Sequence, residues 1–208
     1  MNIRILSVFG LLSLLAVPTW TNAQTQRAGE GRSTLNHAEV GIFGDYLRFA
    51  PGGNTANFVG LGARAGFNVH PNVAIEGQMS YAFERSYSST FQSGATTTLV
   101  RSNIRPITGL FGPKFQVGSG GPFRLFATGK VGFLNFSTNT SGVASGSTFS
   151  SGVAGVGNGG NYLAVYPGGG IEGFAGPLGI RLEAGDEIYF NNGANNNIRL
   201  EFGPAFRF

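Results

Sequence analysis

The stretch Asn197–Phe208, NIRLEFGPAFRF, alternates two kinds of side chain along its length. Ile, Leu, Phe and Pro occupy one set of alternate positions, and Arg, Glu, Gly and Ala occupy most of the other. Successive side chains of a β-strand point to opposite faces of its sheet. The stretch therefore predicts a strand with one apolar face and one face of charged and small residues. Leu178–Phe190, LGIRLEAGDEIYF, has the same pattern.

The alternation recurs along the chain from His37 onward, and helical spacing is nowhere sustained. Gly, Pro, Asn or Ser clusters close each alternating segment, as expected for successive antiparallel strands. The pattern predicts eight strands, at 38–49, 57–69, 72–84, 104–117, 123–136, 162–175, 178–190 and 198–208.

The connections between these segments differ in length in a regular way. The odd-numbered connections lie at 51–57, 85–103, 137–161 and 191–197 and three of them are long, whereas the even-numbered ones are tight turns. Aromatic residues gather near both ends of the apolar faces. Long outer loops, short periplasmic turns and two aromatic girdles are typical of an outer-membrane barrel. A soluble lipocalin-like barrel with the faces inverted is the less favoured alternative.

Three positions depart from the regular pattern. Asp186 is a charge on the apolar face of its segment, so we expect a bulge there or a place near the outer lipid headgroups. Pro113 and Pro204 each lack a backbone N–H, so we expect a bulge or an edge-like irregularity at both.

The second face of the segments would point into the barrel, and it carries seven acids and seven bases. The acids are Glu39, Asp45, Glu76, Glu172, Glu183, Glu187 and Glu201, and the bases are Arg64, Lys114, Arg124, Lys130, Arg181, Arg199 and Arg207. Buried charges are costly unless they are paired, so this balance predicts a closed network of ion pairs. Eight strands enclose a lumen that side chains can fill, and we expect no wide pore.

The first 23 residues form a separate segment, with a basic start, an apolar run and small residues at Thr21 and Ala23. This pattern predicts a secretory signal peptide cleaved after Ala23. A retained membrane helix is disfavoured because the apolar run is shorter than the roughly 20 residues needed to span a bilayer. Residues 24–36 predict a flexible periplasmic leader, and residues 37–208 form the expected barrel domain.

Four segments, taken in order, resemble the outer-membrane protein β-barrel domain of the OmpA and OmpX type. They are EVGIFGDYLRF with the residues that follow to Phe83, GLFGPKF, YPGGGIEG, and IRLEAGDEIYF with the residues that follow to Phe208. The resemblance implies an all-β, eight-stranded antiparallel up-and-down transmembrane barrel in the bacterial outer membrane. It also implies contact with outer-membrane lipids and lipopolysaccharide, and a C-terminal signal at Phe206 and Phe208 for the barrel-assembly machinery.

Family members act in envelope integrity, adhesion or small-solute passage, so the fold does not choose among these functions. We expect a structural or surface-interaction role. The third long connection, 137–161, is interpreted as a solvated spacer in preference to an adhesive surface, and an extracellular ligand bound through the long loops is the alternative. A lipid A-modifying enzyme and a small-solute porin are the alternatives. The lysines and arginines are scattered singly, which argues against nucleic acid as a partner.

Catalysis has little support in the sequence. A lipid A hydrolase needs a base, most often histidine, at the outer leaflet. His37 and His70 fall at the predicted periplasmic end, and only a mechanism using Glu84 or Glu187 stays open. No spacing fits a metal site, and GVGNGG at 155–160 lies outside a strand-to-helix turn. We therefore expect no catalytic residues, no cofactor and no metal.

Overall fold

The computed structural model describes residues 37–49, 56–93, 96–118, 121–141 and 160–208. Most of these residues are in strands. The strands are β1 Ala38–Phe49, β2 Ala56–His70, β3 Val73–Ala82, β4 Arg85–Ser93, β5 Thr96–Val117, β6 Phe123–Ser141, β7 Gly160–Ala175, β8 Leu178–Phe190 and β9 Ala194–Arg207. No helix in these ranges is long and apolar enough to cross a membrane. The predicted signal peptide, the leader and residues 142–159 of the third long connection lie outside the described residues.

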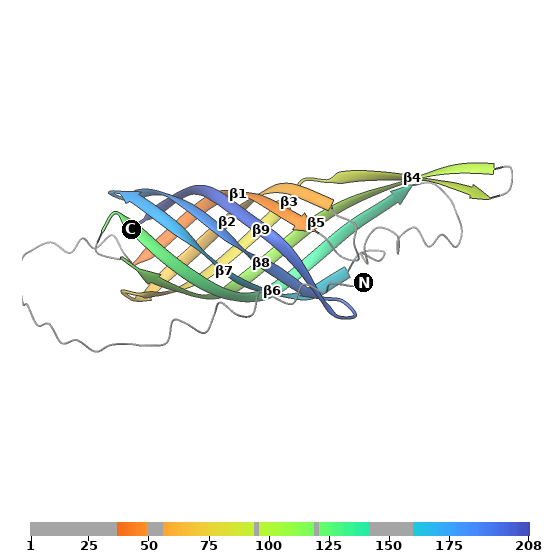
Figure 1. The fold of residues 1–208 in the computed structure, drawn as a ribbon. Helices are drawn as coiled ribbons and strands as arrows, with labels where there is room; N and C mark the ends of the chain where they lie inside the picture. Colours follow the sequence, from red (N-terminus) through yellow and green to blue (C-terminus); the bar gives the residue numbers. More distant parts are fainter. Residues whose placement is uncertain (1–36, 50–55, 94–95, 119–120, 142–159) are drawn as a thin grey trace, which may run out of the picture. The chain divides into compact units, whose positions relative to one another are not determined.

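The strands close into an antiparallel barrel (Figure 1). Neighbours follow the order β3-β2-β1-β9-β8-β7-β6-β5, and pairing of β3 with β5 completes the ring of eight. Where the C-terminus meets the start of β1, the Phe208 carbonyl oxygen accepts hydrogen bonds from the backbone N–H groups of His37 and Ala38, at 3.0 and 2.9 Å. The predicted all-β, eight-stranded antiparallel barrel is confirmed.

β4 lies outside the ring, because among the described strands it pairs with β5 alone. Together with the first part of β5 it forms a hairpin over 85–103, which we call the outer arm. Pairing runs from Arg85↔Ile104 to Ser93↔Thr96. The sequence had predicted a loop here, since the segment is polar, but its Ser, Thr, Tyr, Phe and Val residues also have high or adequate strand propensity. Because β5 continues past the rim of the barrel, β4 has a strand with which it can pair.

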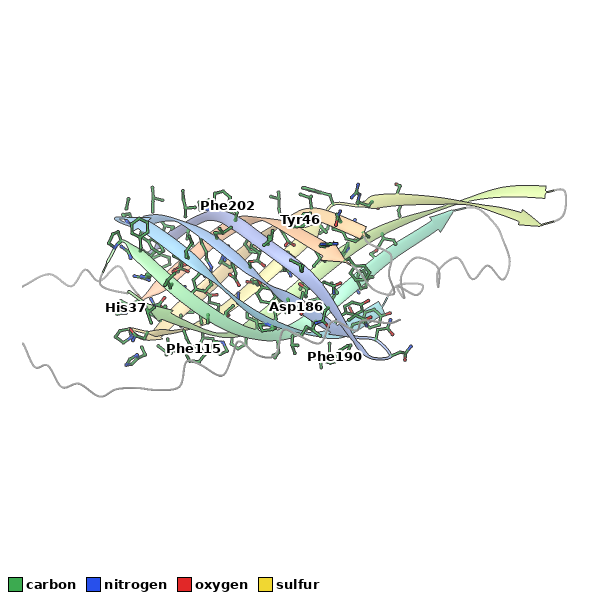
Figure 2. The ribbon with its side chains drawn as sticks, viewed as in Figure 1. His37, Tyr46, Phe115, Asp186, Phe190 and Phe202 are labelled. Carbon is green, nitrogen blue, oxygen red and sulfur yellow. The ribbon has the colours of Figure 1, made fainter. Side chains whose placement is uncertain are left out.

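The arm rises from one end of the barrel, which we call the arm end (Figure 1). The opposite, short-turn end carries the β2–β3, β5–β6 and β7–β8 turns and the C-terminus. Side chains alternate between the outer face and the lumen along each wall strand. In β9, the outward-facing Phe202 is 58% exposed, whereas the preceding residue, the lumen-facing Glu201, is 0% exposed. Figure 2 shows Phe202, Phe115 and Phe190 on the outside of the wall.

The wall keeps its register at the three positions where a bulge had been considered. The unbroken pairs are Ile75↔Pro113, Ile180↔Pro204 and Asp186↔Ile198. No bulge forms at any of the three positions. At the two prolines the other expected feature, an irregular ladder, is found instead. On the other side of β9, pairing with β1 passes from Gly41↔Ala205 directly to Gly44↔Phe202. Pro204 thus interrupts one ladder because it has no N–H to donate, but the closed ring holds the strand in register. Pro113 interrupts the β5–β6 ladder in the same way.

Candidate functional site

The lumen is the candidate site, because each of the eight wall strands sends charged side chains into it. They are Glu39 and Asp45 from β1, Arg64 from β2, Glu76 from β3, Lys114 from β5, Arg124 and Lys130 from β6, Glu172 from β7, Arg181, Glu183 and Glu187 from β8, and Arg199 and Glu201 from β9. None of them is more than 7% exposed. The network therefore links strands that are far apart in the chain.

Near the short-turn end, two bases share three carboxylates. Lys114 Nζ lies 3.6 Å from Glu39, 3.1 Å from Glu76 and 2.8 Å from Glu172. Arg181 Nη1 lies 3.7, 2.6 and 3.0 Å from the same three residues in that order. Because the carboxylates come from β1, β3 and β7, the two bases hold opposite sides of the wall together.

In the middle of the lumen, Glu183 is the shared acceptor. It lies 3.0 Å from Lys130 Nζ and 3.1 Å from Arg64 Nη1. Lys130 also donates to Gln78 Oε1 at 2.5 Å, and Gln78 Nε2 donates to Glu201 Oε1 at 2.7 Å. A neutral amide thus relays hydrogen bonds between a base and an acid, so the network is continuous from β2 across to β9.

Closer to the arm end, Arg199 gathers a second group of acids. Its Nε and Nη2 donate to the two carboxylate oxygens of Asp45 at 3.0 and 2.9 Å, and Nε lies 3.0 Å from Glu201 Oε1. Arg199 also contacts Glu187 and the Ser80 hydroxyl. A planar guanidinium with several donors suits this multiple pairing.

Aromatic rings fill the space around the ion pairs. The Arg64 guanidinium lies 4.6 Å from the centre of the Phe43 ring, and Arg181 lies 4.1 Å from that of Phe126. A Cβ at Gly62 would overlap the Phe43 ring and lie 2.8 Å from the backbone oxygen of Met79. Lumen glycines therefore make room for rings on neighbouring strands, which gives a physical reason for part of the high glycine content.

At the arm end the lumen is apolar, a feature that the sequence analysis missed. We call the cluster of Phe49, Phe58, Phe136, Tyr162 and Tyr189 the aromatic plug. The Phe49 ring stacks on Tyr189 at 5.5 Å and meets Phe136 edge-on at 5.0 Å. A signal was present, since the three phenylalanines continue the alternate positions occupied by lumen charges. Toward the arm end, however, the lumen-facing positions become apolar while their outer-face neighbours Arg48, Asn57 and Asn135 are polar, so an alternation with charges inside did not single the rings out.

Arg207, which the sequence analysis assigned to the lumen network, lies at the short-turn rim and is partly exposed. Its Nε donates to the Gly176 backbone oxygen at 3.0 Å, and its guanidinium lies 4.3 Å from the centre of the Phe174 ring. It makes no ion pair with the acids that the structure describes. Arg207 is outside the network because β9 ends at this residue, where the lumen opens at the rim.

The terminal aromatics lie on the outer face at the same end. Phe206 and Phe208 are 41% and 49% exposed, and their ring centres are 6.0 Å apart.

Both histidines also lie at the short-turn end, where Figure 2 labels His37. His70 Nδ1 accepts a hydrogen bond from the Asn72 backbone N–H at 3.3 Å. Glu84 is exposed next to the arm, whereas Glu187 is buried in the ion-pair network. Within the described ranges, no group of three or more His, Cys, Asp or Glu residues could hold a metal ion.

No protein-family model matches the chain, and no curated protein matches it. The barrel is similar to several solved structures at low identity. Ail of Yersinia pestis, solved with the heparin analogue sucrose octasulfate, is 14% identical, with 83% of this chain and 97% of that chain covered and a TM-score of 0.49. Neisserial surface protein A is 9% identical, with 82% and 97% covered and a TM-score of 0.49. The outer membrane protein OprG of Pseudomonas aeruginosa is 9% identical, with 84% and 97% covered and a TM-score of 0.49.

Proposed function

We propose that the protein is a non-enzymatic β-barrel of the bacterial outer membrane, with a filled lumen and a structural and surface-interaction role. One observation carries the proposal: the outer face is apolar while the charges are inside. Phe123 is 77% exposed and Ile42 is 65% exposed, whereas Arg181 is 0% exposed. Such a face is unfavourable in water and favourable in lipid. The wall strands span 10 to 22 residues, enough for the 9–11 or so that a tilted strand needs.

Aromatic residues on the outer face support the same orientation. Figure 2 labels Tyr46 and Phe190 toward the arm end and Phe115 toward the short-turn end. The exposed phenylalanines and tyrosine of the two groups are Tyr81, Phe83, Phe133 and Phe190 near the arm, and Phe67, Phe115, Phe123, Phe206 and Phe208 near the short turns. Two such groups match the girdles that barrels carry at the two membrane interfaces. The arm end is then the cell exterior.

The biogenesis follows from this proposal. Residues 1–23 direct secretion and are removed, residues 24–36 form a periplasmic leader, and residues 37–208 insert as the barrel. The barrel-assembly machinery reads the terminal strand through Phe206 and Phe208. The exposure of both rings on the outer face of β9 supports this reading, since a lumen residue would be hidden from a docking partner.

The outer arm is the proposed surface for extracellular partners. β4 pairs with β5 on one edge, and no strand that the structure describes covers its other edge. An open edge offers backbone donors and acceptors to an added strand. We therefore propose that an extended segment of an extracellular protein adds to β4.

Fractionation and gel mobility test the membrane proposal. The protein is expected to stay with alkali-stripped envelopes and to migrate differently in SDS when boiled. Recovery in the alkali wash, with identical mobility before and after boiling, would contradict it. For the arm, deletion of residues 87–101 should abolish binding of expressing cells to immobilised extracellular-matrix proteins while leaving the heat-dependent mobility intact. Unchanged binding would remove the arm from the proposal.

Two further measurements test the alternatives. Mass spectra of lipid A should be the same with and without the protein, and a shift by one acyl chain would favour an enzyme. Planar bilayer recordings should show no stable large conductance, because the ion pairs and the aromatic plug fill the lumen. A stable large conductance would favour the porin alternative.

A further inference from the structure

Two wall strands carry the same five-residue pattern as they approach the short-turn end of the barrel. Phe111–Phe115 of β5 reads FGPKF, and Phe202–Phe206 of β9 reads FGPAF. β2 and β7 also run toward the short-turn end, and neither contains the pattern. We call the two segments the β5 motif and the β9 motif. Because the β9 motif includes Phe206 of the proposed assembly signal, the β5 motif is a second candidate for that role.

The two motifs present their side chains in the same directions. In each, the two phenylalanines lie on the outer face, where they are between 41% and 60% exposed. The glycine that follows the first phenylalanine is buried on the lumen side, at Gly112 and Gly203. Figure 2 shows Phe115 and Phe202 on the outside of the wall. A partner that approaches from outside therefore meets the same arrangement on both strands.

The proline of each motif interrupts the ladder on one edge of its strand. Pairing of β5 with β6 passes from Phe111↔Val131 directly to Lys114↔Thr128, and pairing of β9 with β1 has the equivalent gap at Pro204. On the other edge, the ladders with β3 and β8 are complete through both motifs. Each motif is thus irregular on the edge that faces the next strand around the ring.

The glycine of each motif lies against that same next strand. A Cβ at Gly112 would overlap the backbone oxygen of Gly129 in β6, and a Cβ at Gly203 would overlap that of Ile42 in β1. The backbones therefore approach each other closely at both gaps, which accounts for the glycines but not for the phenylalanines.

The two gaps divide the ring into two halves of four strands. One half contains β1, β2, β3 and β5, and the other contains β6, β7, β8 and β9. Each motif lies on the last strand of its half. During folding, β5 has an open edge until β6 pairs with it, just as β9 has one until β1 closes the ring. Open edges promote aggregation, so a partner that covers them is needed at both stages.

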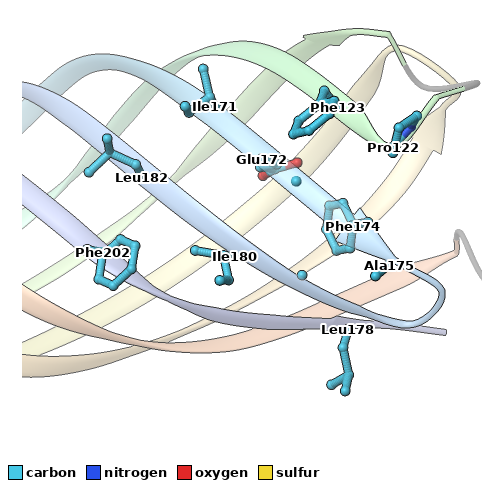
Figure 3. Close-up of a pocket in the computed structure, with 12 residues that line it drawn as sticks. Pro122, Phe123, Ile171, Glu172, Phe174, Ala175, Leu178, Ile180, Leu182 and Phe202 are labelled. Atoms are coloured by element: carbon cyan, nitrogen blue, oxygen red, sulfur yellow. The ribbon is translucent and has the colours of Figure 1, made fainter.

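Each motif also borders an apolar groove on the outer face. The groove beside the β9 motif has a volume of about 650 Å³, and Phe202 lines it together with Ile180 and Leu182 (Figure 3). The groove beside the β5 motif has a volume of about 590 Å³, and Phe111 lines it together with Met79. A partner that contacts the phenylalanines finds apolar surface next to them in both cases.

Pro167 on β7 shows what a proline does without the rest of the motif. It also interrupts a ladder, since pairing of β7 with β8 passes from Val165↔Ile188 to Gly168↔Gly185. The residue two positions before it is a valine, and the residue two positions after it is a glycine. A wall strand thus accommodates a proline gap without flanking phenylalanines, so the phenylalanines of the two motifs are not a requirement of the gap.

We propose that the β5 motif is a second recognition segment for the barrel-assembly machinery, which pairs with the open edge of β5 and holds Phe111 and Phe115. The inference rests on the proposed reading of the terminal strand by the same machinery. Added strands bind through main-chain hydrogen bonds, and side-chain contacts give the specificity. The proline removes one donor from the edge, so a temporary strand is held less tightly and is exchanged for β6.

Peptide competition tests the proposal on the full chain. Vesicles that contain reconstituted barrel-assembly machinery fold the chain, and heat-dependent gel mobility measures the folded fraction over time. Peptides 110–117 and 201–208 should each slow assembly about tenfold, because each competes with the chain for the machinery. Peptide 164–171, which contains Pro167 and three glycines but no phenylalanine, is the matched control and should leave the rate unchanged.

The outcomes separate this inference from the function proposed above. If peptide 201–208 slows assembly and peptide 110–117 does not, the β5 motif is not a recognition segment. If peptide 164–171 slows assembly as much as peptide 110–117, the phenylalanines are not recognised and the inference fails. If neither motif peptide slows assembly, the proposed reading of the terminal strand fails as well. Slower folding in short-chain phosphatidylcholine without machinery would overturn the assignment of the peptide's target to the machinery.

A double variant tests the same residues within the chain. Phe111→Leu combined with Phe115→Leu keeps the outer face apolar and should slow assembly by the machinery about tenfold, with no change in folding without machinery. Phe67→Leu combined with Phe123→Leu replaces two exposed phenylalanines at the same end but outside the motifs, and should assemble like wild type. Equal slowing of both double variants, or equal slowing with and without machinery, would overturn the proposal.

Discussion

The two ends of the lumen are filled by different kinds of side chain. From the short-turn end to the level of Arg199, the filling consists of ion pairs linked by hydrogen bonds. Above that level it consists of the aromatic plug, where Phe49 packs between Tyr189 and Phe136. Removing a charge from the first region leaves its partners buried without a counter-charge, whereas removing a ring from the second leaves a void. Variants in the two regions should therefore lower the free energy of unfolding by different amounts.

The largest loss is expected for Arg181→Met in the ion-pair region. Glu76, Glu172 and Glu183 would lose a shared partner, and breaking a buried pair costs about 3–5 kcal/mol. Urea unfolding in lipid vesicles, followed by far-UV circular dichroism, measures the change in unfolding free energy. Arg181→Lys, which keeps the charge, should lose less. Equal stability of Arg181→Met and wild type would mean that the network does not depend on this base.

A somewhat smaller loss is expected for Phe49→Ala in the aromatic plug. Truncating a packed phenylalanine costs about 3 kcal/mol, at the lower end of the usual range because this ring lies near a rim. The same unfolding experiment applies. Phe111→Ala on the outer face, where the side chain is 60% exposed, is the matched control and should cost less. If both variants lose the same amount, the plug is not a packed core.

Gly62→Ala tests the packing of a ring within the ion-pair region, where the Arg64 guanidinium lies over Phe43. The new methyl group would overlap the Phe43 ring, and overpacking of this kind costs about 1–3 kcal/mol. Phe43→Leu in the same chain should recover part of the loss, because the two sites share one space. Gly129→Ala, whose methyl group would meet nothing within 4 Å, should stay within about 1 kcal/mol of wild type. A harmless Gly62→Ala would show that the ring can move aside.

Tyr166→Phe should have a small effect, within about 0.5 kcal/mol of wild type or slightly stabilising. The hydroxyl is buried without a hydrogen-bond partner among the described residues, so its removal deletes a desolvated group and no bond. Thermal unfolding monitored by gel mobility is sufficient here. A loss above about 1 kcal/mol would reveal a hydrogen bond made through water.

No change at all is expected in conductance when the plug alone is opened. The Phe49→Ala, Phe136→Ala double variant should remain closed in planar bilayers, because the ion pairs below the plug still fill the lumen. A stable conductance in this variant, and none in wild type, would show that the plug is the only barrier.

The alternation along β8 and β9 was enough to predict which residues share a face, because strand side chains repeat every second residue. The arm at 85–103 was not predictable in the same way, since whether a polar segment pairs depends on a neighbour being present. The plug was missed for a related reason. Near the arm end Leu47 and Phe49 point into the lumen while Tyr46 points away from it, and all three residues look alike in a hydrophobic pattern.

What the sequence by itself determined is therefore the strand pattern, the eight wall segments and the set of side chains on each face. These are local properties of a chain with a period of two. Only the tertiary structure decided which carboxylate meets which base, that the plug closes the arm end, and that Arg207 stays at the rim. Those pairings join residues up to 154 positions apart, as in the Asp45–Arg199 bond. The closure of the ring brings these residues together. A pattern that repeats every second residue does not determine which distant residue each side chain meets.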